Sequence, residues 1–127
     1  MEFLHYLGRL LFGGYFIFNG YNHFTNSKMM IGYAQSKNVP MANIAVPFTG
    51  LMLIVGGLTY LFDFHALAGS LILIIFIVPV TFMMHAFWSV EDPNQKMVEM
   101  VNFTKNLALL GALILFAVLR YSLGIPL

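Results

Sequence analysis

Residues 66–88 read ALAGSLILIIFIVPVTFMMHAFW, an apolar stretch that contains no Asp, Glu, Lys or Arg. A helix needs ~20 mostly apolar residues to cross the hydrocarbon core of a bilayer. Three further stretches have comparable length and character: residues 3–24, 44–62 and 103–121. Isolated strands leave backbone groups unsatisfied in hydrocarbon, and four strands are too few to close a barrel. The sequence therefore predicts an all-α integral membrane protein, a four-helix antiparallel bundle, with residues 1–127 forming a single transmembrane domain.

The composition excludes several classes of protein. Hydrophobic residues make up 60% of the chain and charged residues 9%, and the mean hydropathy is +0.84. Such a chain cannot cover itself with a polar surface, so we expect a lipid bilayer around it. The net charge of +1 is too small for a nucleic-acid partner, which needs a concentrated basic patch. Because cysteine is absent, this chain cannot itself carry out thiol–disulfide chemistry.

The connections between the apolar stretches carry their own signals. Residues 25–27 can cap a short helix with one apolar face, which Pro40 ends, and this pattern suits a segment in the membrane interface. The connection at residues 63–65 is so short that the two stretches it joins must be antiparallel neighbours. Asp92 and Pro93 suit the N-cap and first position of a helix, so the fourth helix should begin about two turns before its apolar stretch.

Glycines mark the faces on which the helices should pack. Gly13 and Gly20 fall on one stripe of the first stretch, and Gly50 with Gly57 does likewise on the second. Small residues let helix backbones approach closely in lipid, so these faces predict tight packing and also permit self-association. Pro79 should bend the third helix near its polar end.

Polar side chains occur at few places in the apolar stretches, and those places predict one shared membrane depth. The candidate ligand-binding residues form three pairs spaced by four: Asn19 and His23, Thr81 and His85, and Asn102 and Asn106. The first and third stretches end on the side where the fourth begins, and residues four apart share a helical face. Each pair can therefore point toward a common interior, away from lipid. A simpler alternative is that the histidines meet headgroups or water, while the amides make structural hydrogen bonds between helices.

Several motifs extend over nearly the whole chain. They are GRLL at residues 8–11, NGYNHF at 19–24, the glycine pair at 56–57, HAFW at 85–88 and NFTKNLALLG at 102–111. In these motifs the chain resembles the DoxX family of small bacterial membrane proteins. The resemblance implies a four-helix, multi-pass protein of the bacterial inner membrane. It also implies a link to redox systems, because family members are associated with a thiosulfate:quinone oxidoreductase and with membrane complexes that handle oxidative stress.

The chain departs from the family pattern at three positions. Many relatives have a lysine at the place of His23, a glutamate at the place of Leu53, and an arginine near the place of His65. Without the membrane glutamate, proton-coupled transport is less expected. Histidine keeps a basic group that can also accept a hydrogen bond, bind a metal or relay a proton near neutral pH.

Two classes of function fit these observations. In the first, the protein is a membrane subunit or accessory component of a redox system, and the polar side chains at the shared depth bind a quinone headgroup. The two carbonyl oxygens of a quinone would need donors such as Asn19, His23, His85 or Asn106. In the second class, the protein is a non-catalytic structural or assembly partner of a membrane complex, bound to another protein or to further copies of itself. The polar pairs would then only fix the helix register.

More specialised chemistry is less expected. Ligation of a haem iron by two histidines is disfavoured, because bundle haem proteins usually place these ligands deeper in the membrane. No metal site is predicted, since two histidines lack the third and fourth ligands that are usual for zinc. The apolar stretches contain no nucleophile–base pair, nucleotide fingerprint or paired carboxylates, so nothing indicates catalysis by this chain alone.

Charge predicts the orientation in the membrane. Four lysines lie on the side of the first and third connections, and two arginines lie toward the termini: Lys28, Lys37, Lys96 and Lys105 against Arg9 and Arg120. Loops rich in Lys and Arg tend to stay in the cytoplasm. We therefore expect the lysine-rich connections inside the cell and both termini outside the cytoplasm.

Overall fold

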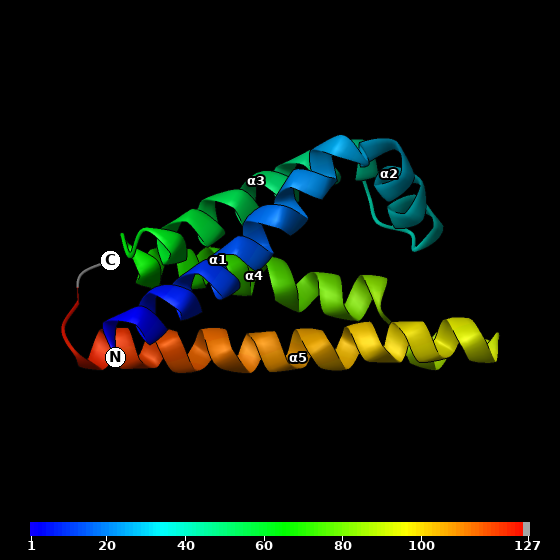
Figure 1. The fold of residues 1–127 in the computed structure, drawn as a ribbon. Helices are drawn as coiled ribbons and strands as arrows, with labels where there is room; N and C mark the ends of the chain where they lie inside the picture. The colour runs from blue at the N-terminus through cyan, green and yellow to red at the C-terminus, as the bar shows by residue number, and fades with distance from the viewer. Residues whose placement is uncertain (126–127) are drawn as a thin grey trace.

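A computed structural model describes residues 1–125 as helices joined by short connections (Figure 1). In chain order the elements are α1 (Glu2–Thr25), α2 (Ser27–Ser36), α3 (Ala42–Leu61), α4 (Ala66–Met84), the 3₁₀ turn η1 (Phe87–Ser89) and α5 (Pro93–Ser122). The four long helices run alternately in opposite directions, and the short α2 lies at the end where α1 stops and α3 begins (Figure 1). The predicted all-α class, with a short helix between the first two long ones, is confirmed.

Three segments of the described chain are long and apolar enough to cross a membrane. They are Ala42–Leu61, Ala66–Ser89 and Pro93–Ser122. Large apolar side chains also cover the outer faces of the helices, such as Leu115, which is 71% exposed. Lipid, rather than water, is the solvent that suits such a surface. The first predicted span, in α1, is not among the three segments, because Arg9 and its glycine, tyrosine and amide residues lower its hydropathy.

The backbones of α1 and α3 touch at two pairs of glycines. A Cβ atom added at Gly13 would lie 2.7 Å from the carbonyl oxygen of Gly57, and one added at Gly57 would lie 2.6 Å from that of Gly13. Two turns along, a Cβ at Gly20 would lie 2.6 Å from the carbonyl oxygen of Gly50. Only glycine permits these approaches, so the packing predicted from the glycine stripes is confirmed.

Two arginines stabilise the end of the bundle where both termini lie. The guanidinium of Arg9 donates to the carbonyl oxygens of Tyr60 at 3.2 Å and Leu61 at 2.7 Å, both in the last turn of α3, where no further helical turn follows to bond them. Arg120 of α5 forms an ion pair with Asp63 in the α3–α4 connection. Partial burial opposes ionisation of Asp63, but the hydrogen bond and charge of Arg120, with the charges of Arg9 and His5, hold its pKa below the ordinary value.

A compact core joins the four long helices near this end and in the middle of the bundle. Its buried members are Phe16, Leu53, Tyr60, Leu73, Ile77 and Leu113. The hydroxyl groups of Tyr60 and Ser70 share a hydrogen bond that links α3 to α4 within this core. Toward the α2 end, the α1–α3 pair rises away from α5 (Figure 1). The core therefore does not extend along the full length of the bundle.

Two helix ends show how local sequence determines the boundaries. The α-helix of α4 ends at Met84, with His85 as its C-cap, although the predicted third stretch continues to Trp88. Hydropathy alone does not detect this end, because the residues that follow are still apolar. The start of α5 at Pro93 agrees with the prediction, since the carboxylate of Asp92 accepts a hydrogen bond from the backbone of Gln95 at 2.9 Å.

We predict that Gly13→Ala destabilises the protein, whereas Gly14→Ala on the same helix does not. The added methyl at position 13 would meet backbone atoms of α3, and overpacking of this kind costs about 1–3 kcal/mol. A Cβ at Gly14 meets nothing within 4 Å, so only the small gain in helix propensity remains. Thermal unfolding in a mild detergent measures both effects. Equal midpoints for the two variants would contradict the close contact.

Candidate functional site

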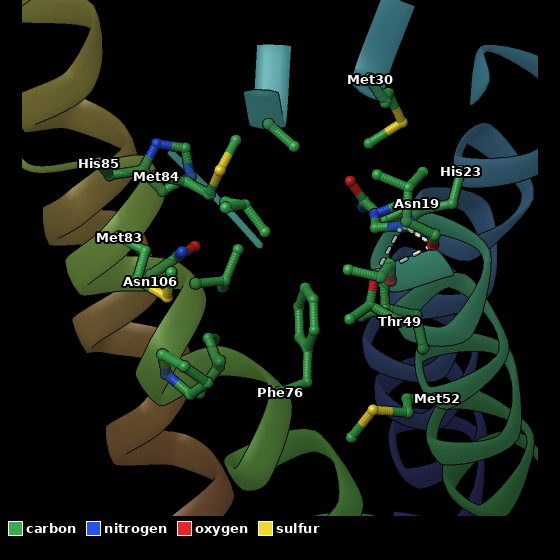
Figure 2. A pocket seen from close by; sticks show the side chains of 18 of the residues that line it. Asn19, His23, Met30, Thr49, Met52, Phe76, Met83, Met84, His85 and Asn106 are labelled. Carbon is green, nitrogen blue, oxygen red and sulfur yellow. Dashed lines mark hydrogen bonds between the residues drawn. The ribbon is translucent and has the colours of Figure 1, made fainter. Parts of the chain in front are cut away.

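A cavity of about 590 Å³ lies at the α2 end of the bundle, where the α1–α3 pair separates from α4 and α5 (Figure 2). Residues of all five α-helices line this central cavity, and most of them are apolar. Its volume is within the range of 300–1,000 Å³ that is usual for small-molecule sites. The polar lining residues gather on two opposite walls, one formed by α1 and α3 and the other by α4 and α5 (Figure 2).

On the first wall, His23 is held by α3. Its Nδ1 atom lies 2.9 Å from the carbonyl oxygen of Val46 and 3.2 Å from the hydroxyl oxygen of Thr49. A carbonyl oxygen only accepts hydrogen bonds, so Nδ1 carries the hydrogen and donates it. The Thr49 hydroxyl lies within hydrogen-bond distance of the carbonyl oxygens of Ala45, at 2.7 Å, and Val46, at 3.0 Å. In the neutral ring, Nε2 then keeps a lone pair that a ligand can use.

Asn19, one turn before His23, also lines the first wall. Its amide nitrogen donates to the carbonyl oxygen of Tyr15 at 2.7 Å, within α1. This bond uses one amide hydrogen, and the side-chain carbonyl oxygen remains as an acceptor. The side chain is therefore not a bridge between helices, which was the structural alternative for this residue.

On the second wall, His85 is held by a buried carboxylate on α5. Its Nδ1 atom lies 2.7 Å from Oε2 of Glu99, whose residue is only 2% exposed. The other oxygen, Oε1, accepts a hydrogen bond from the hydroxyl of Tyr33 and lies 3.7 Å from the ammonium of Lys37. Tyr33 and Lys37 come from α2 and the residue that follows it. One carboxylate thus joins α2, α4 and α5.

The hydroxyl of Tyr33 stays protonated in this arrangement. Burial, followed by the hydrogen bond to Glu99 and the negative charge of Glu99, raises the pKa of Tyr33 above its ordinary value. A protonated hydroxyl can donate, and the Tyr33 oxygen also lies 3.5 Å from the carbonyl oxygen of Met84. These contacts hold α2 over the end of the central cavity, where Met30 and Ala34 contribute to the lining.

The structure brings together five of the six residues that the sequence singled out. Asn19 and His23 lie on the first wall, and His85, Asn102 and Asn106 lie on the second. Thr81 is different, because its side chain does not line the cavity. It is 2% exposed and donates to the carbonyl oxygen of Ile77, one turn back in α4, at 2.5 Å. Its hydroxyl is therefore satisfied within its own helix.

Sequence reasoning missed Glu99. This residue precedes the fourth apolar stretch, so a search for polar residues within the apolar stretches does not include it. A signal was present, because Glu99, Asn102 and Asn106 are spaced by three and four residues and hence share one face of α5. The missing information was the position of α2, which carries two of the three groups that contact the carboxylate.

The central cavity also reaches the outer surface of the bundle between α3 and α4. Phe48 of α3 is 62% exposed and Ile75 of α4 is 65% exposed, yet both belong to the lining. Residues that are exposed and also line a cavity mark places where it opens, and Pro79, Met83 and Lys105 are further residues of this kind. Because Phe48 and Ile75 are apolar and lie within apolar helices, the opening beside them suits a lipid environment.

We predict that Glu99→Ala loosens α2. The substitution removes the acceptor for Tyr33 and His85 and the opposite charge for Lys37, and breaking such a buried arrangement costs up to ~3–5 kcal/mol. Trypsin should therefore cut after Lys37 several-fold faster than in the unaltered protein. Glu91→Ala, the same change at an exposed position, is the control and should leave the rate unchanged. Equal cleavage of the two variants would contradict the conclusion that Glu99 holds α2 in place.

Comparisons with known proteins agree with this architecture. The sequence model of the DoxX family matches residues 4–86, from α1 to the residue after the C-cap of α4. Searches of curated proteins and of solved structures found no match. The motif at residues 102–111 lies outside the matched region, which nevertheless covers more than half of the chain. On this basis, the chain belongs to the DoxX family.

Proposed function

We propose that this protein binds the headgroup of a membrane quinone in the central cavity, as a membrane subunit or accessory component of a redox system. One observation carries the proposal: a cavity of about 590 Å³ has polar side chains on two opposite walls and is otherwise apolar. A quinone headgroup has two oxygen atoms at opposite ends of an apolar ring. The distribution of polar groups around the cavity matches that of the ligand.

The apolar lining suits a planar ring. The side chain of Phe76 lies between the two walls (Figure 2), and its ring centroid is 6.2 Å from that of His23. An aromatic ring in this place offers a surface for edge or face contact with a headgroup. Four methionines complete this part of the lining: Met30, Met52, Met83 and Met84. Their flexible thioether chains can adjust to the shape of a bound ring.

The opening between α3 and α4 supports a ligand that comes from the membrane. A quinone with an isoprenoid tail can place its headgroup between the polar walls while the tail passes Phe48 and Ile75 into lipid. A water-soluble ligand of the same size would gain nothing from such an apolar opening. This feature favours a lipid-soluble ligand over a soluble metabolite.

One observation favours the second class of function, a structural or assembly role. Glu99 connects three helices, and His85 is one of its partners, so His85 also stabilises the bundle. A protein that only supports a membrane complex would need this network but would not need a cavity between two polar walls. Binding experiments separate the two functions.

We predict that His85→Ala weakens binding of whichever redox form of a short-chain ubiquinone the unaltered protein binds more tightly. The expected loss is about tenfold, which corresponds to about 1.4 kcal/mol, near the value of one hydrogen bond in a buried site. Calorimetric titration of the purified protein in detergent measures the dissociation constant. His5→Ala is a matched control at the opposite end of α1, next to Asp63, and should bind like the unaltered protein. If the unaltered protein does not bind the quinone but copurifies with a stoichiometric protein partner, the assembly role replaces this proposal.

We also propose that the protein lies in the bacterial inner membrane with its α2 end in the cytoplasm. The four lysines, which belong to α2, its C-cap and the first half of α5, lie toward this end of the structure, and both termini lie at the other (Figure 1). The antiparallel packing of α1 along α3 supports a crossing by α1 as well, since the two helices occupy the same depth.

The orientation predicts the behaviour of reporter fusions. Alkaline phosphatase, which is active only outside the cytoplasm, should be active when fused to the C-terminus. The same reporter placed in the connection at residues 90–92 should be inactive, because this connection lies at the α2 end. The reverse pattern of activity would show that the lysine-rich end faces outward.

A further inference from the structure

We infer that the central cavity selects the reduced, hydroxyl-bearing form of its ligand, a quinol, over the oxidised quinone. This inference rests on the proposed function. It comes from the hydrogen bonds that the two histidines, one on each polar wall, already make within the protein. Quinone and quinol have nearly the same shape, so the roles of the hydrogen-bonding groups decide between them.

The backbone fixes the role of His23. Its Nδ1 hydrogen is donated to the carbonyl oxygen of Val46 at 2.9 Å, and a carbonyl cannot take the opposite role. The ring nitrogen that remains for a ligand is Nε2, which is an acceptor in the neutral ring. The second hydrogen-bonding group of this wall, Asn19, donates one amide hydrogen to the carbonyl oxygen of Tyr15 and keeps both a second amide hydrogen and an acceptor oxygen, so it does not discriminate.

A carboxylate fixes the role of His85 in the same way. Glu99 accepts from the hydroxyl of Tyr33 and lies 3.7 Å from the ammonium of Lys37, surroundings that favour its ionised form. An ionised carboxylate only accepts hydrogen bonds, so the Nδ1 atom of His85, at 2.7 Å, must donate. The nitrogen that His85 offers to a ligand is again Nε2, an acceptor in the neutral ring.

Some other donors around the cavity are already in use, whereas the exposed ammonium of Lys105 also belongs to the lining and lies over the ring of Tyr15, 5.9 Å from the ring centroid. The hydroxyl of Tyr33 donates to Glu99, and that of Thr49 lies within bonding distance of α3 carbonyl oxygens. The amides of Asn102 and Asn106 can act either as donors or as acceptors, so they do not discriminate. The two histidines are the lining groups that the protein fixes as acceptors toward a ligand, and they favour the form that carries hydroxyl groups.

The two forms of the ligand respond differently to this arrangement. A quinol carries two hydroxyl groups, which can donate to Nε2 of His23 on one wall and to Nε2 of His85 on the other. A quinone carries two carbonyl oxygens, which would face nitrogen lone pairs at both histidines and would have to find donors elsewhere in the lining. Sites that bond a ligand hydroxyl reject analogues that lack it, because the buried groups of the site are left unpaired.

The test compares the two redox forms directly. Dissociation constants are measured by calorimetry at pH 8, without oxygen, for ubiquinol and ubiquinone that carry a single isoprene unit. We expect the quinol to bind at least tenfold more tightly. Equal binding, or tighter binding of the quinone, would overturn the inference and leave the proposed function intact. Binding of neither form would overturn the proposed function itself.

A change of the hydrogen-bonding group on the first wall provides the decisive variant. His23→Lys replaces an acceptor by an ammonium group, which only donates, so the preference should move at least tenfold toward the quinone. His23→Gln, whose amide can donate or accept, is a milder variant that tests the same point if the lysine variant does not fold, and it should reduce the preference. An unchanged preference in a folded variant would show that His23 does not select the redox form.

Discussion

The contact between the backbones of α1 and α3 is the constraint on which the rest of the structure depends. At Gly13 with Gly57, and at Gly20 with Gly50, the helices are as close as two peptide backbones can be. They consequently behave as one unit, and the space in the bundle lies between this unit and α4 with α5. The same contact positions the histidine of the first wall, because a Cβ added at Gly50 would lie 2.6 Å from the Cβ of His23.

The second wall depends on electrostatics more than on close packing. A carboxylate in apolar surroundings needs donors and opposite charge, and Glu99 obtains hydrogen bonds from Tyr33 and His85 and an ion pair with Lys37. The cavity is thus bounded by a rigid pair of helices on one side and by a charged network on the other. The network also explains how a ten-residue helix, too short to be stable alone, keeps a defined position.

Much of this architecture follows from the sequence, because hydropathy and glycine spacing report directly on helices in lipid. The antiparallel arrangement of α3 and α4, the N-cap at Asp92 and the placing of His23, His85 and Asn106 around one interior space were predicted from pattern alone. The end of α4 at Met84 was not, since apolar residues continue beyond it. Thr81 was placed at the site because it shares a face with His85, but a hydroxyl can bond to its own helix and then needs no partner in the interior.

Glu99 and the tautomers of the histidines lay beyond sequence reasoning for one shared reason. Each depends on which atom of a distant segment comes within about 3 Å, and no periodicity encodes that distance. The clearest example is the expectation that His23 and His85 donate hydrogen bonds to a ligand. Both residues do donate, but they donate to the protein itself.

Under the proposed function, the opening beside Phe48 and Ile75 is where a ligand exchanges with the membrane. A molecule that arrives there diffuses in two dimensions and never enters bulk water. The relevant concentration is its mole fraction among the lipids, so occupancy depends on the composition of the bilayer rather than on the volume of the cell. In detergent, the apparent dissociation constant should accordingly scale with the amount of micellar phase, because dilution into micelles acts as dilution of the ligand.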